Sequence, residues 1–213
     1  MALLFTDTAS LETLRERWDV DLRHPLTDTQ WMQATAQVKH ISRNMGFHFT
    51  QFNYLHRTYL MSHRIARMYP TAPDTCPHCS APGADFMYMI WDCTIIKDAW
   101  EEVINITSEI VEVPAPDTPE SCLLGIRARP KGCKYRNRFI DLPMALYKRQ
   151  IARHWKARTP PNTHTWAKVL LKWAVADSTA LSEGGGRATR GVGLQVWDSY
   201  VQSLEAKDET RPP

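Results

Sequence analysis

The sequence lacks the short motifs that mark the common nucleotide- and metal-dependent enzymes. It contains no adjacent pair of aspartates, the arrangement with which polymerases hold two metal ions. It also contains no Gly-Lys-Ser/Thr triplet, so the glycine-rich stretch GGGRATRG that begins at Gly184 is not a phosphate-binding loop. We therefore expect that the chain is not an enzyme.

Long hydrophobic runs are also missing. Residues 1–5 contain an apolar run shorter than the roughly 7 to 15 residues of a signal-peptide core, and no stretch approaches the about 20 apolar residues of a membrane span. We expect no membrane association and a nuclear or cytoplasmic location rather than secretion. In such a reducing compartment, a pair of cysteines separated by two residues indicates metal binding or redox chemistry rather than a disulfide.

The hydrophobic content and its spacing predict a mainly α fold. Hydrophobic residues make up 43% of the 213 residues, which is enough for a core. Apolar residues recur every three or four positions, most clearly from Asp85 to Glu112, as expected for amphipathic helices. Further helices are predicted at 10–18, at 27–42 with a Thr27–Gln30 capping box, at 49–68, from the end of the loop 127–135 to 156, after Asn162, and at 194–204.

Prolines and glycines divide these helices into four segments. Pro143 lies inside a predicted helix, which it either starts or kinks. The proline-rich loop 72–84 cannot be regular structure, so we predict an irregular helical domain around a small zinc-knuckle-like loop. The predicted segments are 1–45 (N-terminal helices), 46–126 (knuckle-like region and long helix), 127–183 (basic helical region) and 184–213 (flexible linker, short helix and tail).

The positive charge is concentrated in one part of the chain. The whole chain carries a net charge of +3, but residues 127–158 contain eleven Lys and Arg residues and one acid, Asp141. Such asymmetry is typical of a nucleic-acid-binding surface, although a solvated helix face has the same composition. The candidate nucleic-acid-binding residues are Arg127, Arg129, Lys131, Lys134, Arg136, Arg138, Lys148, Arg149, Arg153, Lys156 and Arg158.

Three cysteines have the spacing of a metal site. Cys76 and Cys79 form a CPHC turn, and Cys93 follows in the sequence WDC. Zinc prefers four thiolate or imidazole ligands, but Tyr88 occupies the position where a fourth ligand is expected, five residues before Cys93. Asp85 is the best candidate to replace it, with His78, Asp92 or water as alternatives. The other interpretations are unrelated thiols and, much less favoured, a redox pair.

Several longer stretches resemble the C-terminal region of the reverse transcriptases of LINE-type (non-LTR) retrotransposons. They are RTYLMSHRIARMYPTAPDTCPHC, MIWDCTIIKDAWEEV and CLLGI, which lie between residues 57 and 126. The pattern in that family is a Tyr-containing helix, a Cys pair, a His, a W-x-C triplet and a further Trp. Here the corresponding residues are Tyr59, Cys76 with Cys79, Tyr88 in place of the His, Trp91 to Cys93, and Trp100.

The resemblance implies a non-catalytic C-terminal fragment with an accessory role in binding nucleic acid. Its partner would be RNA or another single-stranded nucleic acid, and its cofactor zinc, bound weakly because Tyr88 replaces the His. Two alternatives remain open at this point. If the chain does not bind nucleic acid, it is either an inert transposon relic or a helical scaffold for protein interactions.

Overall fold

The computed structural model describes residues 8–40, 44–111, 113–127 and 134–183, together with the single residues 202 and 206. Within these ranges the fold is mainly α, as predicted, and the one β-type pairing is an isolated bridge between Thr75 and Pro82. The helix predicted at 194–204 lies outside the described residues apart from position 202. The division of the chain into four segments remains a prediction.

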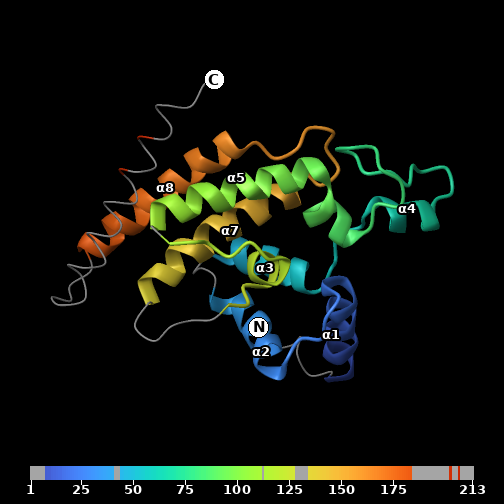
Figure 1. The fold of residues 1–213 in the computed structure, drawn as a ribbon, viewed down its shortest axis with the longest axis horizontal. Helices are drawn as coiled ribbons and strands as arrows, with labels where there is room; N and C mark the ends of the chain where they lie inside the picture. The colour runs from blue at the N-terminus through green and yellow to red at the C-terminus, as the bar shows by residue number, and fades with distance from the viewer. Residues whose placement is uncertain are drawn as a thin grey trace.

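The helices form two groups that meet at α3 (Figure 1). Helices α5, α7 and α8 pack on one another, and α3 lies against both α7 and α2. Helix α4 and the loop that follows it lie at one end of the molecule (Figure 1). The elements are α1 (Thr8–Leu22), α2 (Asp28–His40), α3 (Met45–Leu55), α4 (Ser62–Met68), the π-helical turn η1 (Tyr88–Asp92), α5 (Thr94–Val111), α6 (Pro119–Leu124), α7 (Lys134–His154) and α8 (Thr163–Glu183).

Two helices begin at the caps that the sequence predicts. At the start of α2, the backbone N–H of Thr27 donates to Gln30 Oε1 at 2.9 Å, and the N–H of Gln30 donates to Thr27 Oγ1 at 3.3 Å. This reciprocal pair is the predicted capping box. Before α8, Asn162 Oδ1 accepts the N–H of Thr165 at 3.1 Å. Both caps satisfy N–H groups that have no partner within the helix.

The single helix predicted for residues 49–68 is wrong, because the chain breaks between α3 and α4. Arg57 has a φ of 53°, in the left-handed region, where a helix cannot continue. Its guanidinium pairs with Asp21 at 2.6 Å and lies over the ring of Phe86, 4.9 Å from the centroid. We infer that these contacts hold the strained backbone of Arg57. Tertiary interactions therefore override the local helical periodicity.

Three buried tryptophans anchor the core. Trp18, Trp100 and Trp166 are at most 1% exposed, and each indole N–H donates to a backbone carbonyl of another segment. The acceptors are the carbonyls of Leu55, Ile90 and Pro143, at 2.9, 2.9 and 3.0 Å respectively. A buried indole needs such a partner, so these bonds position the helices as well as fill space. The bond to Pro143, which lies inside α7, connects that helix to α8.

Candidate metal centre and basic surface

The segment between α4 and η1 forms a small hairpin-like turn that presents Cys76 and Cys79. Its two arms are joined by the N–H of Gly83 donating to Asp74 O at 2.8 Å and the N–H of Cys76 donating to Ala81 O at 2.8 Å. The N–H of Ser80 donates to Cys76 O at 2.9 Å, and this closes the turn. Ser80 and Gly83 both have a positive φ, near 65°, which allows the chain to reverse direction here. The turn thus fixes the two cysteines without regular secondary structure.

A π-helical turn places the side chains of Cys93 and Tyr88 on the same side of the chain. The sequence predicts one continuous α-helix over 85–112, but the structure has η1 from Tyr88 to Asp92 and α5 from Thr94. In an α-helix, residues five apart are separated by about 140° around the axis. Here the N–H of Cys93 donates to Tyr88 O at 2.7 Å, an i to i+5 bond that closes a wider turn. The wider turn allows both side chains to face the cysteine pair.

The three cysteines form a compact cluster. The sulfur atoms of Cys76, Cys79 and Cys93 all lie within 4.8 Å of one another, and the sulfurs of Cys76 and Cys93 are 3.7 Å apart. Cys76 and Cys93 are buried and Cys79 is partly exposed. Three thiols at these distances could hold a metal ion. The cluster predicted from the spacing of CPHC and WDC therefore exists in the fold.

Tyr88 contacts this cluster directly. Its hydroxyl lies 3.1 Å from the sulfur of Cys79. The hydrogen bond to Cys79 raises the pKa of Tyr88 to about 12, so the phenol keeps its proton at neutral pH. Burial raises the pKa of Cys79, but hydrogen bonds from Tyr88 and from the N–H of Ala81 outweigh it and lower the pKa overall. Burial raises the pKa of Cys93 to about 12.

The structure does not bring Asp85 into the cluster. Its carboxylate Oδ1 accepts the N–H of Tyr88 at 2.8 Å and so caps the turn that begins there. A side chain at the start of a helical turn is well placed to satisfy an unpaired backbone N–H, and this local bond is the physical reason that Asp85 is not a cysteine neighbour. Within the described residues, the possible metal-binding group consists of the three cysteines alone.

The predicted basic residues occupy very different environments. Lys148 is 2% exposed and does not contribute to the surface. Its ammonium donates to Gln51 and, at 3.0 Å, to Leu123 O. Arg127 forms an ion pair with Asp141, and its side chain is 7% exposed. The side chains of Lys148 and Arg127 are therefore buried and do not belong to the predicted basic surface. Helix α7 is covered by α3, α5 and α8, so part of a basic sequence must face the interior.

The remaining basic residues divide into three groups. Arg129 and Lys131 lie outside the described residues, and of Lys134, Arg136 and Arg138 only the helical backbone is described. Arg149 is half-buried, with its guanidinium 5.2 Å from the ring centroid of Phe47. Three residues at the C-terminal end of α7 and just beyond it are exposed: Arg153, Lys156 and Arg158.

The exposed basic group lies next to the cysteine turn. The imidazole of His78, between Cys76 and Cys79, lies close to the backbone of Arg158. Burial lowers the pKa of His78, and the nearby backbone of Arg158 opposes this shift. The ring of Trp155 lies 6.0 Å from that of Tyr59, and the ammonium of Lys156 lies 4.6 Å from the ring centroid of Trp155. The CPHC turn and the end of α7 thus form one continuous region.

Two cavities were not predicted from the sequence. One, of about 400 Å³, lies between the end of α7 and the start of α8. The other, of about 240 Å³, is lined by Arg17, Arg57 and Arg64 together with Tyr59 and Asp85. The arginines come from three different elements, so no local pattern in the sequence could have connected them.

The chain matches no protein-family model. In the part of the chain that the structure describes, no helix is both long and apolar enough to cross a membrane.

Proposed function

We propose that the chain is a non-catalytic module that binds single-stranded nucleic acid, with RNA as the main candidate. It would correspond to the C-terminal region of LINE-type reverse transcriptases, which its sequence resembles. The observation that supports this most directly is the contact between His78 and Arg158. It places the cysteine turn beside the segment of chain that carries the exposed residues Arg153, Lys156 and Arg158.

The environment of Tyr88 supports the resemblance independently. In the family pattern, a His stands at this position. Here the Tyr88 hydroxyl is 3.1 Å from the Cys79 sulfur, so a side chain at position 88 reaches the cluster despite the five-residue spacing. The substitution of Tyr for His removes a good zinc ligand, because a phenol stays protonated near neutral pH.

Zinc is the metal proposed for Cys76, Cys79 and Cys93. Zinc–sulfur bonds of about 2.3 Å in a tetrahedron separate two sulfurs by about 3.8 Å. The sulfurs of Cys76 and Cys93 are 3.7 Å apart, so the thiols fit this ion with little rearrangement. A bound zinc ion would cross-link the cysteine turn to η1 and have a structural role. Its binding would also stabilise the folded chain, since the site forms only when the chain folds.

The exposed cations define the expected binding mode. Arg153, Lys156 and Arg158 would contact phosphates, which releases counterions and makes the affinity depend on salt. The half-buried aromatic rings of Tyr59 and Trp155 lie beside them. Basic residues combined with aromatic rings are typical of proteins that bind single strands without strong sequence preference.

Fluorescence anisotropy with a labelled single-stranded RNA of roughly 16 nucleotides tests the proposal. We expect binding that weakens steeply between about 50 and 200 mM salt. Replacing Arg153, Lys156 and Arg158 together by Gln should reduce the slope of log affinity against log salt by about 2, because each single-strand phosphate contact contributes about 0.7.

A matched control removes three exposed cations elsewhere: Arg23, Lys39 and Lys97 to Gln. This variant carries the same net charge but should keep nearly the full slope. If both triple variants change binding equally, the effect is one of net charge and the proposed surface is wrong. If the wild-type chain does not bind RNA or single-stranded DNA even at low salt, the interpretation as an inert relic is favoured.

A protein-interaction scaffold is the second candidate. Met45 and Phe49, four residues apart on α3, are 64% and 67% exposed. Large apolar side chains on the same helix face are typical of a docking surface when they are exposed. Replacing both by Ser should leave RNA affinity unchanged under the first proposal. The scaffold is the better interpretation if neither the wild-type chain nor the variant binds RNA and the double substitution abolishes self-association or partner binding.

A further inference from the structure

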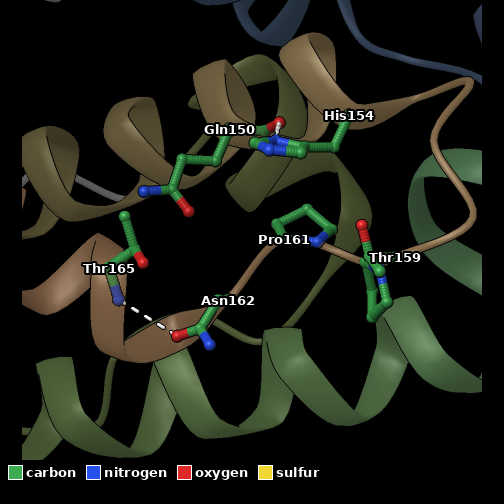
Figure 2. A pocket seen from close by; sticks show the side chains of 7 residues that line it. Gln150, His154, Thr159, Pro161, Asn162 and Thr165 are labelled. Carbon is green, nitrogen blue, oxygen red and sulfur yellow. Dashed lines mark hydrogen bonds between the residues drawn. The ribbon is translucent and has the colours of Figure 1, made fainter.

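The cavity of about 400 Å³ lies where α7 ends and α8 begins (Figure 2). Gln150 and His154 come from α7, Thr159 and Pro161 from the connecting segment, and Asn162 and Thr165 from the start of α8. Figure 2 shows these side chains around an open space between the two helices. Its volume is within the range of about 300 to 1,000 Å³ that is typical of small-ligand sites.

Two rigid rings line this cavity. Pro161 is buried, and its ring provides an apolar surface. The Nδ1 atom of His154 lies 2.9 Å from the backbone carbonyl of Gln150. Because a carbonyl oxygen only accepts, Nδ1 carries the hydrogen, and Nε2 of the neutral ring is an acceptor. The bond also fixes the orientation of the imidazole, so that the cavity has a preformed flat wall.

The polar groups of the cavity include both donors and acceptors. Asn162 uses its Oδ1 to cap α8, which leaves its amide nitrogen as a donor. The hydroxyls of Thr159 and Thr165, both on exposed residues, can donate or accept. The Gln150 side chain, 9% exposed, connects the two helices. In the amide orientation that satisfies both partners, it donates to Asn162 O at 3.3 Å and accepts from the N–H of Trp166 at 3.2 Å.

Three exposed cations and one acid belong to the segments that border the cavity. Arg153, Lys156 and Arg158 are exposed and belong to the same stretch of chain as His154 and Thr159. The carboxylate of Glu102, on α5, accepts the hydroxyl of Thr163 at 2.6 Å, so this acid is engaged in fixing the start of α8. A ligand with a flat polar part and a negatively charged part would match both the cavity and its surroundings.

We propose that this cavity binds one unpaired nucleobase of a single-stranded nucleic acid while the neighbouring phosphates contact Arg153, Lys156 and Arg158. This inference rests on the proposed function and adds the place where a base is held. A nucleobase is flat enough to lie against the rings of His154 and Pro161. Its edge carries the mixed donors and acceptors that Asn162, Thr159 and Thr165 can pair with.

The test compares binding of an intact single-stranded RNA with binding of the same strand lacking all its bases. Anisotropy of the labelled strands measures both. We expect the wild-type chain to bind the intact strand at least about fivefold more tightly, since a bound base contributes strongly to single-strand affinity. The variant Thr165→Trp, which fills the cavity with a large ring, should reduce this difference severalfold and retain the salt dependence. Thr165→Ala, which leaves the cavity open, should retain both.

Asn105→Trp is the matched control, because Asn105 is an exposed, uncharged residue of α5. Thermal unfolding checks that each variant is folded. As a second measurement on the wild-type chain, strands carrying 4-thiouridine should cross-link on irradiation to residues between 150 and 165.

The outcomes separate this inference from the proposed function. Salt-dependent binding that is equal for intact and base-free strands, and unchanged in Thr165→Trp, overturns the base site and leaves the proposed function intact. Absence of binding to both strands overturns both. Competition by inorganic phosphate as effective as that by a nucleoside monophosphate identifies an anion site and overturns the inference. Binding of nucleoside monophosphates in the cavity without any preference for the intact strand shows a site for free nucleotides and also overturns it.

Discussion

Replacing the buried Lys148 by Met should change how the stability of the protein depends on pH. Lys148 is 2% exposed, and burial lowers the pKa of its ammonium from 10.5 to about 7, an effect that the charges of Asp141 and Cys122 oppose. The unfolded chain keeps this proton up to about pH 10, whereas the folded chain releases it above about pH 7. The unfolded state therefore binds more protons in that window, and the free energy of unfolding rises with pH.

The size of the effect follows from the shift in pKa. Each pH unit above 7 adds up to about 1.4 kcal/mol, so Lys148 should contribute an increase of about 2 to 3 kcal/mol between pH 6 and pH 9. Met has a similar unbranched shape and does not titrate. In Lys148→Met this increase should disappear, and the loss of the hydrogen bond to Gln51 should shift the whole curve by an amount that does not depend on pH.

Urea unfolding followed by tryptophan fluorescence measures the free energy at each pH, with a reductant and a chelator present so that thiols and metal do not contribute. Lys97→Met, on the exposed side of α5, is the control and should follow the wild-type curve. Parallel curves for the wild type and Lys148→Met would refute the reasoning, since they would mean that Lys148 does not release its proton in the folded state.

Two further predictions concern the backbone and the metal centre. Gly125 has a φ of 73°, and a Cβ there would lie 2.7 Å from Gln37 Cγ, whereas Gly83, with a φ of 65°, has nothing within 4 Å. Each Gly→Ala change should destabilise the protein by about 1 to 3 kcal/mol, and Gly125→Ala should be the more severe in urea unfolding; equal losses would contradict the predicted clash. Tyr88→His should tighten zinc binding by at least about tenfold in competition with a coloured chelator, since even residues that only support a ligand change affinity by 10- to 100-fold. Tyr88→Phe, which removes the hydroxyl without adding a ligand, should not tighten zinc binding. Similar zinc affinities for the two variants would contradict the assignment of position 88 as the fourth-ligand position.

The local part of the fold could be predicted from the sequence. The cap at Thr27 and the cap at Asn162 depend on residues three positions apart, and both are present as predicted. The cysteine cluster could be predicted for a related reason. Metal ligands in a tight turn have a characteristic spacing, and Cys93 stood close to them in the sequence.

The remaining features depend on contacts between distant residues. The break at Arg57 coincides with its ion pair to Asp21, and the π-turn that ends before Cys93 departs from the α-helical periodicity of the sequence. The basic stretch 127–158 was predicted to lie on the surface as a whole. Charge counting could not show that Lys148 reaches Gln51 and Leu123 in the interior, because those partners lie 97 and 25 residues away.

The π-helical turn has a consequence for how the cysteine site can vary among related chains. A π-turn contains one more residue than an α-helical turn. Removing one residue between Tyr88 and Cys93 would leave the pair four apart, a spacing at which an ordinary α-helix also places two side chains on the same face. We therefore expect that a chain with four residues from the fourth-ligand position to the cysteine, in an ordinary α-helix, can build the same site as this chain builds with five.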